Sequence, residues 1–393
     1  MNQAEKMGDT RSEIKVKKFK RMKLVAIIVL VAFLLGGLIL FRNDITIENL
    51  RYLIKYLDFS SSGTFNEETV IHYNADSGNR FHVFRGDLAL VSESGVTLYD
   101  RRGSAVMTDS YSMTNPTAVC GDRYLAIYDL GGYQVRIYNS FSLLYENTFD
   151  YAVQGVSING DGAFCVVTSE KSYHSAVFVY DRDFEEIHRW LSADKFAIDA
   201  YLSDQNILNV TTVKTQNGEL LGEMIGLKLG EEIPLYTVSF ADQIPLAVRS
   251  HRDFAVLVTD ETITFMDDGE TVASASIPAG SLEQISLGEE LFCIVQDELS
   301  IGVNFRLRAF DEKGQELISE KLSSQILKVE TWEDTVYVLT HAKLYVLRAD
   351  EEMKSYTLDG EYSDFGVLSE DTVILCSDTT AKIRFLDKKG DSK

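Results

Sequence analysis

Between Leu98 and Asp387 the chain repeats one pattern of apolar and polar positions eight times. Each copy has two short stretches rich in apolar residues, and a small, usually acidic turn closes the second stretch. Stretches of this kind predict β-strands, and a unit of about 40 residues built from short strands predicts one blade of a β-propeller. The eight turns lie at Leu98-Tyr99-Asp100, Ile137-Tyr138-Asn139, Val179-Tyr180-Asp181, Leu227-Lys228-Leu229-Gly230, Phe265-Met266-Asp267, Ala309-Phe310-Asp311, Leu347-Arg348-Ala349-Asp350 and Phe385-Leu386-Asp387.

We therefore predict an all-β fold, an eight-bladed β-propeller. A seven-bladed ring is the alternative, and it would leave the weakest copy, around Val210 to Gly230, outside the ring. The eighth copy, Phe365 to Asp387, has only three strands, so its sheet lacks an outer strand. Because proteins cover open sheet edges, we expect the unassigned apolar strand Thr69 to Tyr73 to complete this sheet and close the ring.

One apolar run differs from all the others. Leu24 to Phe41 is uncharged for 18 residues, and a helix of that length spans about 27 Å, close to the thickness of a bilayer core. Lys and Arg are concentrated on its N-terminal side, which predicts a cytoplasmic N-terminus and a single-pass cell-membrane protein. A cleaved signal peptide is the alternative, but no small-x-small cleavage site follows the run. The larger part of the chain is then extracytoplasmic.

The remaining N-terminal residues complete the predicted organisation. We expect a basic cytoplasmic tail at 1–23, the transmembrane helix at 24–41, a juxtamembrane amphipathic helix at 42–59, a linker at 60–66 and the propeller at 67–393. The formal charge is −22 overall, and because residues 1–23 carry +5, the remainder carries −27. Such an acidic domain repels nucleic acid, so we expect no nucleic-acid partner.

Candidate chemistry is sparse in this sequence. The four cysteines are far apart, each in a strand-like stretch, and are expected to be buried free thiols. The six histidines show no zinc-binding spacing, and Asn74 to Arg85 lacks the final Glu of a calcium loop. There is no P-loop, no GxGxxG and no GxSxG motif, and Ser192 to Lys195 matches SxxK without its partner motifs. We expect no metal, no cofactor and no catalytic residue.

Binding residues are predicted from loops that differ between copies. The turns between the second and third strands are predicted to be short in some copies and long at 169–175, 214–222 and 297–304. Variable loops on a rigid scaffold are where binding usually occurs. The candidate binding residues on this face are Tyr133, Tyr173, His174, Gln216, Asn217, Asn304 and Arg306.

The repeated strand that ends in an apolar residue and Asp resembles the quinoprotein-like and WD40-like propellers. Tyr99-Asp100, Tyr180-Asp181 and Phe310-Asp311 stand where WD40 repeats have Trp-Asp, although no copy carries the Gly-His pair. The turn after Asp181 resembles a quinoprotein blade, but no adjacent cysteines are present, so no quinone is expected. Taken whole, the basic tail, single span, helix start at Ile45 to Arg51 and acidic propeller resemble a bacterial family of single-span membrane proteins, domain of unknown function 5711.

Three functions are compatible with these features. The first is a non-enzymatic binding or scaffold module, anchored in the membrane through Leu24 to Phe41, for an envelope protein, peptide or glycan. The second is an envelope glycosidase or lyase with carboxylates over the propeller channel. The third is a ligand sensor that signals through the cytoplasmic tail. We favour the first, because the ring has many predicted loops and no catalytic motif.

Overall fold

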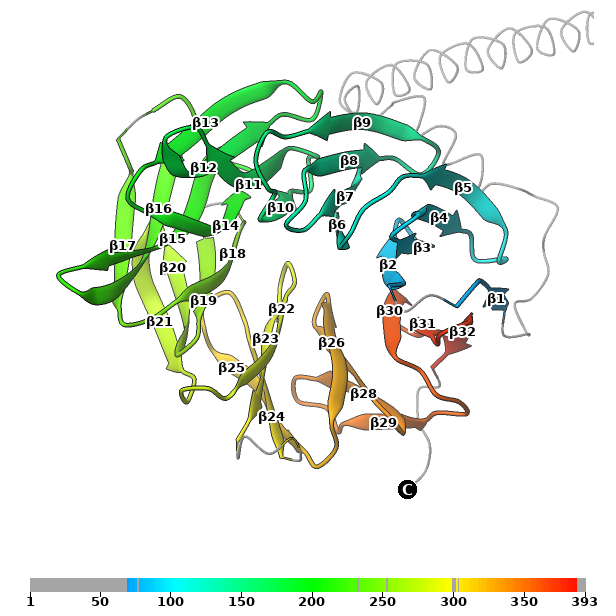
Figure 1. The fold of residues 1–393 in the computed structure, drawn as a ribbon. Coiled ribbons are helices and arrows are strands. Elements are labelled where there is room, and N and C mark those ends of the chain that lie inside the picture. Colours follow the sequence, from blue (N-terminus) through cyan, green and yellow to red (C-terminus); the bar gives the residue numbers. More distant parts are fainter. Residues whose placement is uncertain are drawn as a thin grey trace, which may run out of the picture. The chain divides into compact units, whose positions relative to one another are not determined.

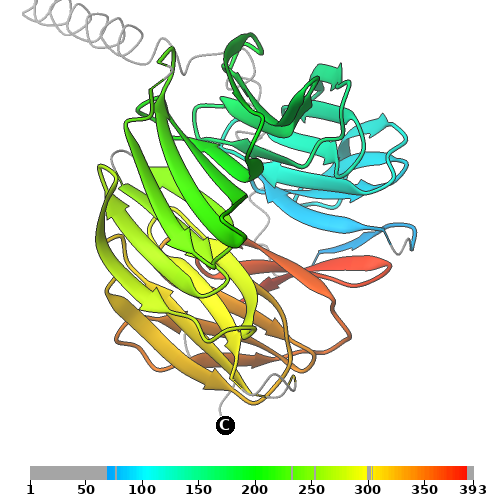
Figure 2. The ribbon, with the colours of Figure 1, turned by 60° about the vertical axis from the view of Figure 1, so that its left-hand side comes forward.

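The computed structural model describes residues 69–75, 78–231, 233–251, 254–298, 302 and 304–386, and the described residues form 32 strands joined by turns and loops. The strands make eight antiparallel sheets of four strands each, β1 being one of the four in the last sheet. The sheets follow one another around a ring (Figure 1), and an oblique view shows them as separate blades (Figure 2). The predicted eight-bladed, all-β propeller is confirmed.

The first four blades run through strands β2 to β17. Their bounds are β2 (Arg80–Phe84), β3 (Asp87–Ser92), β4 (Gly95–Tyr99), β5 (Ala105–Ser110), β6 (Pro116–Cys120), β7 (Leu125–Asp129), β8 (Gln134–Tyr138), β9 (Leu143–Thr148), β10 (Gly155–Ile158), β11 (Phe164–Glu170), β12 (Tyr173–Tyr180), β13 (Glu186–Ser192), β14 (Phe196–Leu202), β15 (Ile207–Gln216), β16 (Glu219–Lys228) and β17 (Tyr236–Ala241).

The other four blades run through β18 to β32 and take β1 as their last strand. Their bounds are β18 (Pro245–His251), β19 (Phe254–Thr259), β20 (Thr262–Asp267), β21 (Glu270–Ser276), β22 (Leu282–Leu287), β23 (Phe292–Asp297), β24 (Phe305–Phe310), β25 (Glu316–Leu322), β26 (Ile326–Trp332), β27 (Thr335–Thr340), β28 (Lys343–Arg348), β29 (Lys354–Thr357), β30 (Asp364–Ser369), β31 (Thr372–Cys376), β32 (Thr380–Phe385) and β1 (Val70–His72).

The seven-bladed alternative is wrong. It required the stretch around Val210 to Gly230 to lie outside the ring, but β15 and β16 are the two central strands of blade 4 and pair in register from Ile207 with Lys228 to Gln216 with Glu219. These strands have ten residues each, the longest described in the ring. The copy looked weak because its acidic turn is replaced by Leu229-Gly230, whereas its strands are complete.

Blade 8 is closed by the strand from the other end of the chain, as the sequence predicted. β1 pairs antiparallel with β32, Val70 opposite Lys382 and His72 opposite Thr380. The backbone bonds Tyr73 N to Thr379 O and Ile383 N to Thr69 O, each 3.0 Å, extend the pairing at both ends. In Figure 1 the blue β1 lies beside the red β32. The ring is therefore sealed by hydrogen bonds between its first and last segments.

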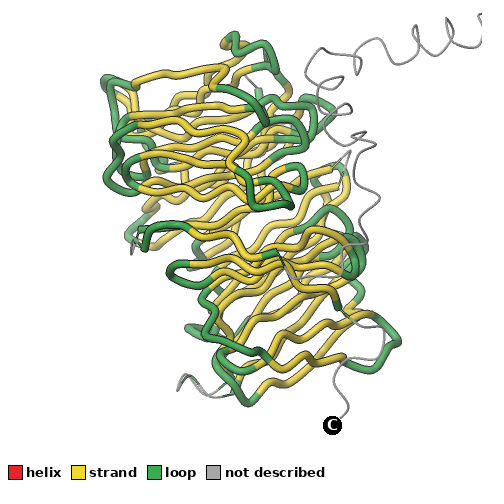
Figure 3. Tube along the Cα trace, turned by 90° about the vertical axis from the view of Figure 1, so that its right-hand side faces the viewer, coloured by secondary structure: helices red, strands yellow, loops and turns green. Residues whose placement is uncertain are grey.

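Apolar side chains between adjacent blades form the core. One cluster joins Phe84 and Leu98 of blade 1 to Leu125 and Tyr138 of blade 2, and a corresponding cluster joins blade 8 to blade 1. Since a blade packs on both of its faces, all five residues of β7 are buried, and the strand does not alternate between buried and exposed side chains. In side view the described chain is strand joined by loops throughout (Figure 3).

The acidic turns that mark the repeats have a structural role. In blade 6 the Asp311 carboxylate accepts the backbone N–H groups of Lys313 and Gln315 at 2.9 and 2.8 Å. Asp100, Asn139 and Asp181 bond two backbone N–H groups in the same way in blades 1, 2 and 3. The side chain satisfies donors that the turn leaves without strand partners. The repeated acids thus shape turns between the third and fourth strands.

The N-terminal predictions lie outside the described residues. The tail at 1–23, the transmembrane helix at 24–41, the amphipathic helix at 42–59 and the linker at 60–66 stay predictions. Within the described part of the chain, no helix has the length and apolar character needed to span a bilayer.

Candidate functional site

Antiparallel blades present two different ends to solvent. We call "linker face" the end that carries the turns between the second and third strands of each blade together with the links from one blade to the next. Of the three turns expected to be long on this face, two are not. Residues 169–175 and 214–222 extend β11, β12, β15 and β16, and the strands are joined by two-residue turns at Lys171-Ser172 and Asn217-Gly218. Only 297–304 remains a connection longer than a tight turn, between β23 and β24.

The structure places the predicted residues in three groups on the linker face. Tyr133 follows β7, and Tyr173 and His174 begin β12. Gln216 and Asn217 lie at the tip of the β15–β16 hairpin of blade 4, and Asn304 and Arg306 lie at the start of β24 in blade 6. These residues remain candidates for binding a ligand.

The first group belongs to a set of exposed aromatic residues in blades 2, 3 and 4. Tyr133 is 52% exposed, Tyr173 41% and Phe196 51%, and Tyr151, in the link between blades 2 and 3, is 37% exposed. The imidazole of His174 stacks on the Phe196 ring with centroids 4.7 Å apart. We call these five residues the aromatic set. Tyr151 and Phe196 were not among the predicted residues, because they lie outside the turns between the second and third strands.

Backbone contacts hold the aromatic set on rigid elements. The turn that carries Tyr133 bonds the link before blade 3, with Phe149 N donating to Tyr133 O at 2.8 Å and Val153 N to Gly132 O at 2.7 Å. The Ser175 hydroxyl accepts Ala197 N at 2.8 Å, which joins the start of β12 to the start of β14. The aromatic rings are therefore presented by paired strands and short links.

Charged residues lie close to the aromatic set. The Glu223 carboxylate is 2.7 Å from Lys195 Nζ and 2.9 Å from Lys214 Nζ, and although burial opposes its ionisation, these two lysines lower its pKa. Arg189 pairs with Glu170 at 3.3 Å while its guanidinium lies over the Phe178 ring. Apolar rings with a charged periphery are the composition of many protein-binding surfaces.

A second site candidate lies between blades 5 and 6. It is a pocket of about 560 Å³. Its lining residues are Ser276, Pro278, Ser281, Gln296, Glu298, Arg306, Arg308 and Glu316. Arg306, predicted from the sequence, donates through Nε to Glu298 at 2.5 Å, and Lys321 contacts the other oxygen of the same carboxylate at 2.9 Å. These hydrogen bonds, from Lys321 and Arg306, lower the pKa of Glu298.

The first strand of every blade lies innermost in the ring (Figure 1), and we call the region that these strands surround the channel. Burial raises the pKa of the Cys120 thiol to about 12, although this side chain is exposed to solvent. Cys120 ends β6, one of these inner strands, so protein surrounds a thiol that still meets solvent. Burial likewise lowers the pKa of His82 to about 4, with Lys328 and Arg80 acting in the same direction. Cys165, Cys293 and Cys376 are buried free thiols as expected, and Cys120 differs from that expectation.

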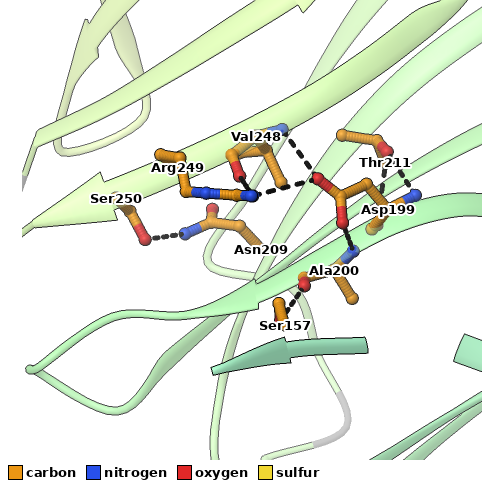
Figure 4. Close-up of polar contacts among 8 residues, drawn as sticks. All are labelled: Ser157, Asp199, Ala200, Asn209, Thr211, Val248, Arg249 and Ser250. Atoms are coloured by element: carbon orange, nitrogen blue, oxygen red, sulfur yellow. Dashed lines mark hydrogen bonds and ion pairs between the residues drawn. The ribbon is translucent and has the colours of Figure 1, made fainter. Parts of the chain in front are cut away.

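Polar side chains in the channel bond one blade to the next. Asp199 of β14 accepts Val248 N of blade 5 at 3.1 Å and contacts Arg249 Nη1 at 3.3 Å, as Figure 4 shows. Gln284 of blade 6 likewise accepts a backbone N–H of the next blade, that of Val329, at 3.0 Å.

The junction between blades 7 and 8 shows the same arrangement. Glu330 accepts Val367 N at 3.2 Å, and Lys328 bonds Asp364 at 2.8 Å and the Phe365 carbonyl at 2.6 Å. The channel acids therefore serve the junctions between blades. Among the described residues, no group of three or more His, Cys, Asp or Glu side chains is arranged to hold a metal ion.

These features define the class of the protein: an eight-bladed β-propeller. The chain belongs to the family of unknown function DUF5711, whose profile matches residues 61–384. A search of curated proteins gave no match.

Solved structures similar to this chain are propellers of low sequence identity. BamB from Moraxella catarrhalis has 9% identity and a TM-score of 0.54, over 80% of this chain and 98% of that chain. The computationally designed protein Ika8 has 12% identity and a TM-score of 0.60, over 81% and 100%. The WD40 domain of Neurospora crassa Pan2 has 9% identity and a TM-score of 0.50, over 83% and 96%. At these identities the similarity shows the fold alone.

Proposed function

We propose that this chain is a membrane-anchored, extracytoplasmic binding module whose linker face docks a protein or peptide segment of the cell envelope. The observation that carries the proposal is the aromatic set. Aromatic residues supply large contact areas at little cost in conformational entropy and are enriched at the centres of protein interfaces. Here they are exposed on neighbouring elements of three blades and have charged residues around them.

The rigidity of the scaffold also supports docking. Side-chain bonds between inner strands and the β1 closure hold the blades in one arrangement, so little ordering is required when a partner binds. The membrane anchor in this proposal is the uncharged run from Leu24 to Phe41, and the orientation follows from the basic residues that precede it. An enzymatic alternative gains no support from the described channel, because Asp199, Glu330 and Asp364 are engaged in contacts between blades.

Site-specific photo-crosslinking in intact cells tests the proposal. A photoreactive amino acid is placed at Tyr133, at Tyr173, or at Val272 as the control, in the full-length chain. Val272 is 54% exposed but lies on β21, the outer strand of blade 5. We expect discrete crosslinked protein bands at 133 and 173 that are absent at 272.

A matched pair of substitutions then tests the energetic role of the rings. Phe196→Ala combined with Tyr173→Ala is expected to weaken the crosslinked complex at least about thirtyfold, since a single interface hot spot contributes about 2 kcal/mol or more. Ile187→Ala combined with Val272→Ala, on outer strands, is expected to leave the complex unchanged. Equal crosslinking at 133, 173 and 272, or equal loss in both double variants, would exclude docking on this face.

A further inference from the structure

We propose that the pocket between blades 5 and 6 is a saccharide-binding site, separate from the aromatic set. The pocket of about 560 Å³ falls within the range of small-molecule sites and has room for a mono- or disaccharide. Of its eight lining residues, Pro278 alone lacks a polar side chain. A ligand that fills this space must therefore form many hydrogen bonds, which favours one rich in hydroxyl groups.

The charges in the pocket lining cancel in pairs. Glu298 is held by Arg306 at 2.5 Å, and Glu316 Oε2 accepts two hydrogen bonds from Arg308, 3.0 Å from Nε and 2.7 Å from Nη2. Burial opposes ionisation of Glu316, but the bonds from Arg308 outweigh it and lower its pKa. A carboxylate or ammonium ligand would compete with one of these pairs. A hydroxyl group competes with neither, because it accepts from the arginines and donates to the carboxylates.

A buried amide supplies an independent indication of a ligand. Gln296 lies on β23 beside Arg306 of β24, is only 3% exposed, and lines the pocket. Its Nε2 is enclosed and has no hydrogen-bond partner among the described residues. A buried donor without a partner is unfavourable in a folded protein, and each such group requires an explanation. A ligand oxygen in the pocket would provide the missing acceptor.

The walls of the pocket are fixed across the two blades. Arg308 Nη1 donates to the Ser276 carbonyl of blade 5 at 2.9 Å, and the Arg308 guanidinium lies 5.0 Å from the centre of the Phe310 ring. The Ser281 hydroxyl donates to the Pro278 carbonyl at 2.7 Å in the link that leads to blade 6. Planar side chains that are already oriented by such contacts favour hydrogen bonding to adjacent hydroxyl groups, since little entropy is lost.

The test uses the purified full-length chain in a detergent without a sugar headgroup. Glucose, N-acetylglucosamine and maltose are titrated by calorimetry and by saturation-transfer NMR, with acetate and glutamate as charged probes. We expect saturable binding of at least one saccharide and none of the charged probes. Co-sedimentation with purified peptidoglycan then distinguishes the sources of the saccharide. Sedimentation of the protein that the free sugar prevents indicates a glycan ligand, and no sedimentation indicates a soluble saccharide.

Gln296→Leu is the decisive variant, because it replaces the amide by an apolar side chain of similar volume. We expect it to weaken saccharide binding at least about tenfold, as sites built to hydrogen-bond a substrate depend strongly on those bonds. Its unfolding midpoint should not fall, since no bond of the Nε2 group is lost. Gln154→Leu, at an exposed position in the link before β10, is the matched control and should bind normally.

Three results would overturn the proposal: no saccharide saturates the protein, Gln296→Leu binds as tightly as the unsubstituted chain, or acetate or glutamate binds in preference to the sugars. The double variant Tyr173→Ala with Phe196→Ala is expected to retain saccharide binding. A failure of protein docking and a failure of saccharide binding are thereby distinguished.

Discussion

The closing strand β1 gives the sharpest prediction, because three residues seal a ring of eight blades. Ile71 points into the interface of blades 8 and 1, is 2% exposed, and packs in a cluster with Phe81, Leu88 and Ile374. Val70, its neighbour, is 43% exposed on the same strand. Replacing each with alanine therefore separates burial from strand pairing, since both lose a β-branched side chain at the same sheet edge.

The expected magnitudes differ widely. Ile71→Ala removes a fully buried side chain from a packed cluster and should lower the free energy of unfolding by about 2 to 5 kcal/mol. Val70→Ala removes mostly exposed atoms and should change it by about 0.5 kcal/mol or less. Tyr73→Phe lies between them, because it deletes the hydroxyl that donates to the Ser377 carbonyl at 2.6 Å, a bond expected to contribute about 1 kcal/mol.

Urea unfolding of the full-length chain, followed by the fluorescence of Trp190 and Trp332, measures all three changes. The order of destabilisation should be Ile71→Ala, then Tyr73→Phe, then Val70→Ala. If Ile71→Ala is no more destabilising than Val70→Ala, β1 is not docked in solution and the ring is closed by another means. If the slope of the unfolding free energy against urea concentration is the same in all variants, each of them exposes the same amount of surface on unfolding.

Three further predictions concern the channel, the packing and the turns. The pKa of His82 is lowered to about 4, so the unfolded chain binds a proton before the folded chain does, and the free energy of unfolding falls as pH drops from about 6.5 towards 4. His82→Gln should reduce this loss in urea unfolding measured at several pH values, and an unchanged dependence of stability on pH would refute the prediction. Gly222→Ala should lower the melting temperature by several degrees, because a Cβ there would collide with the Gln243 carbonyl oxygen. Gly155→Ala meets no atom within 4 Å and should be tolerated, and similar effects of the two substitutions would contradict the packing. Asp311→Ala should lower the free energy of unfolding by about 1 kcal/mol, because two hydrogen bonds from backbone N–H groups to the carboxylate are lost. An equal decrease for Glu312→Ala, at the neighbouring exposed position, would argue against a role of Asp311 in stabilising the turn.

The fold was largely predictable because its signals are local and repeated. Apolar stretches, glycine turns and acidic stops predicted the blades, and the missing strand in the last copy pointed to Thr69 to Tyr73 as the closing strand. Hairpin lengths were predicted less well. The stretch 214–222 was expected to be a loop, although Asn217-Gly218 is the pair that favours a two-residue turn, and both residues have positive φ angles of 56° and 88°.

The candidate sites were predictable only in part, for a physical reason. Arg306 was found because it lies beside a variable connection, but the pocket around it includes Ser276 and Ser281, which come from the preceding blade and link. Likewise Phe196 belongs to the aromatic set because β14 lies next to β12, a contact made through Ser175 and Ala197. Such sites form between repeats, and no periodic pattern within one repeat encodes the side chains that meet across the junction.

The pairing of β1 with β32 also sets the order in which this chain can mature. Tyr73 and Ser377, which bond across the closure, are 304 positions apart in the chain. During synthesis β1 is therefore made first and waits for the last strands, while the growing array of blades keeps an open end. Contacts of such long sequence separation form slowly, and open strand edges favour association with other chains. Synthesis of β30 to β32, rather than the folding of any single blade, is thus the step that commits this protein to a closed ring.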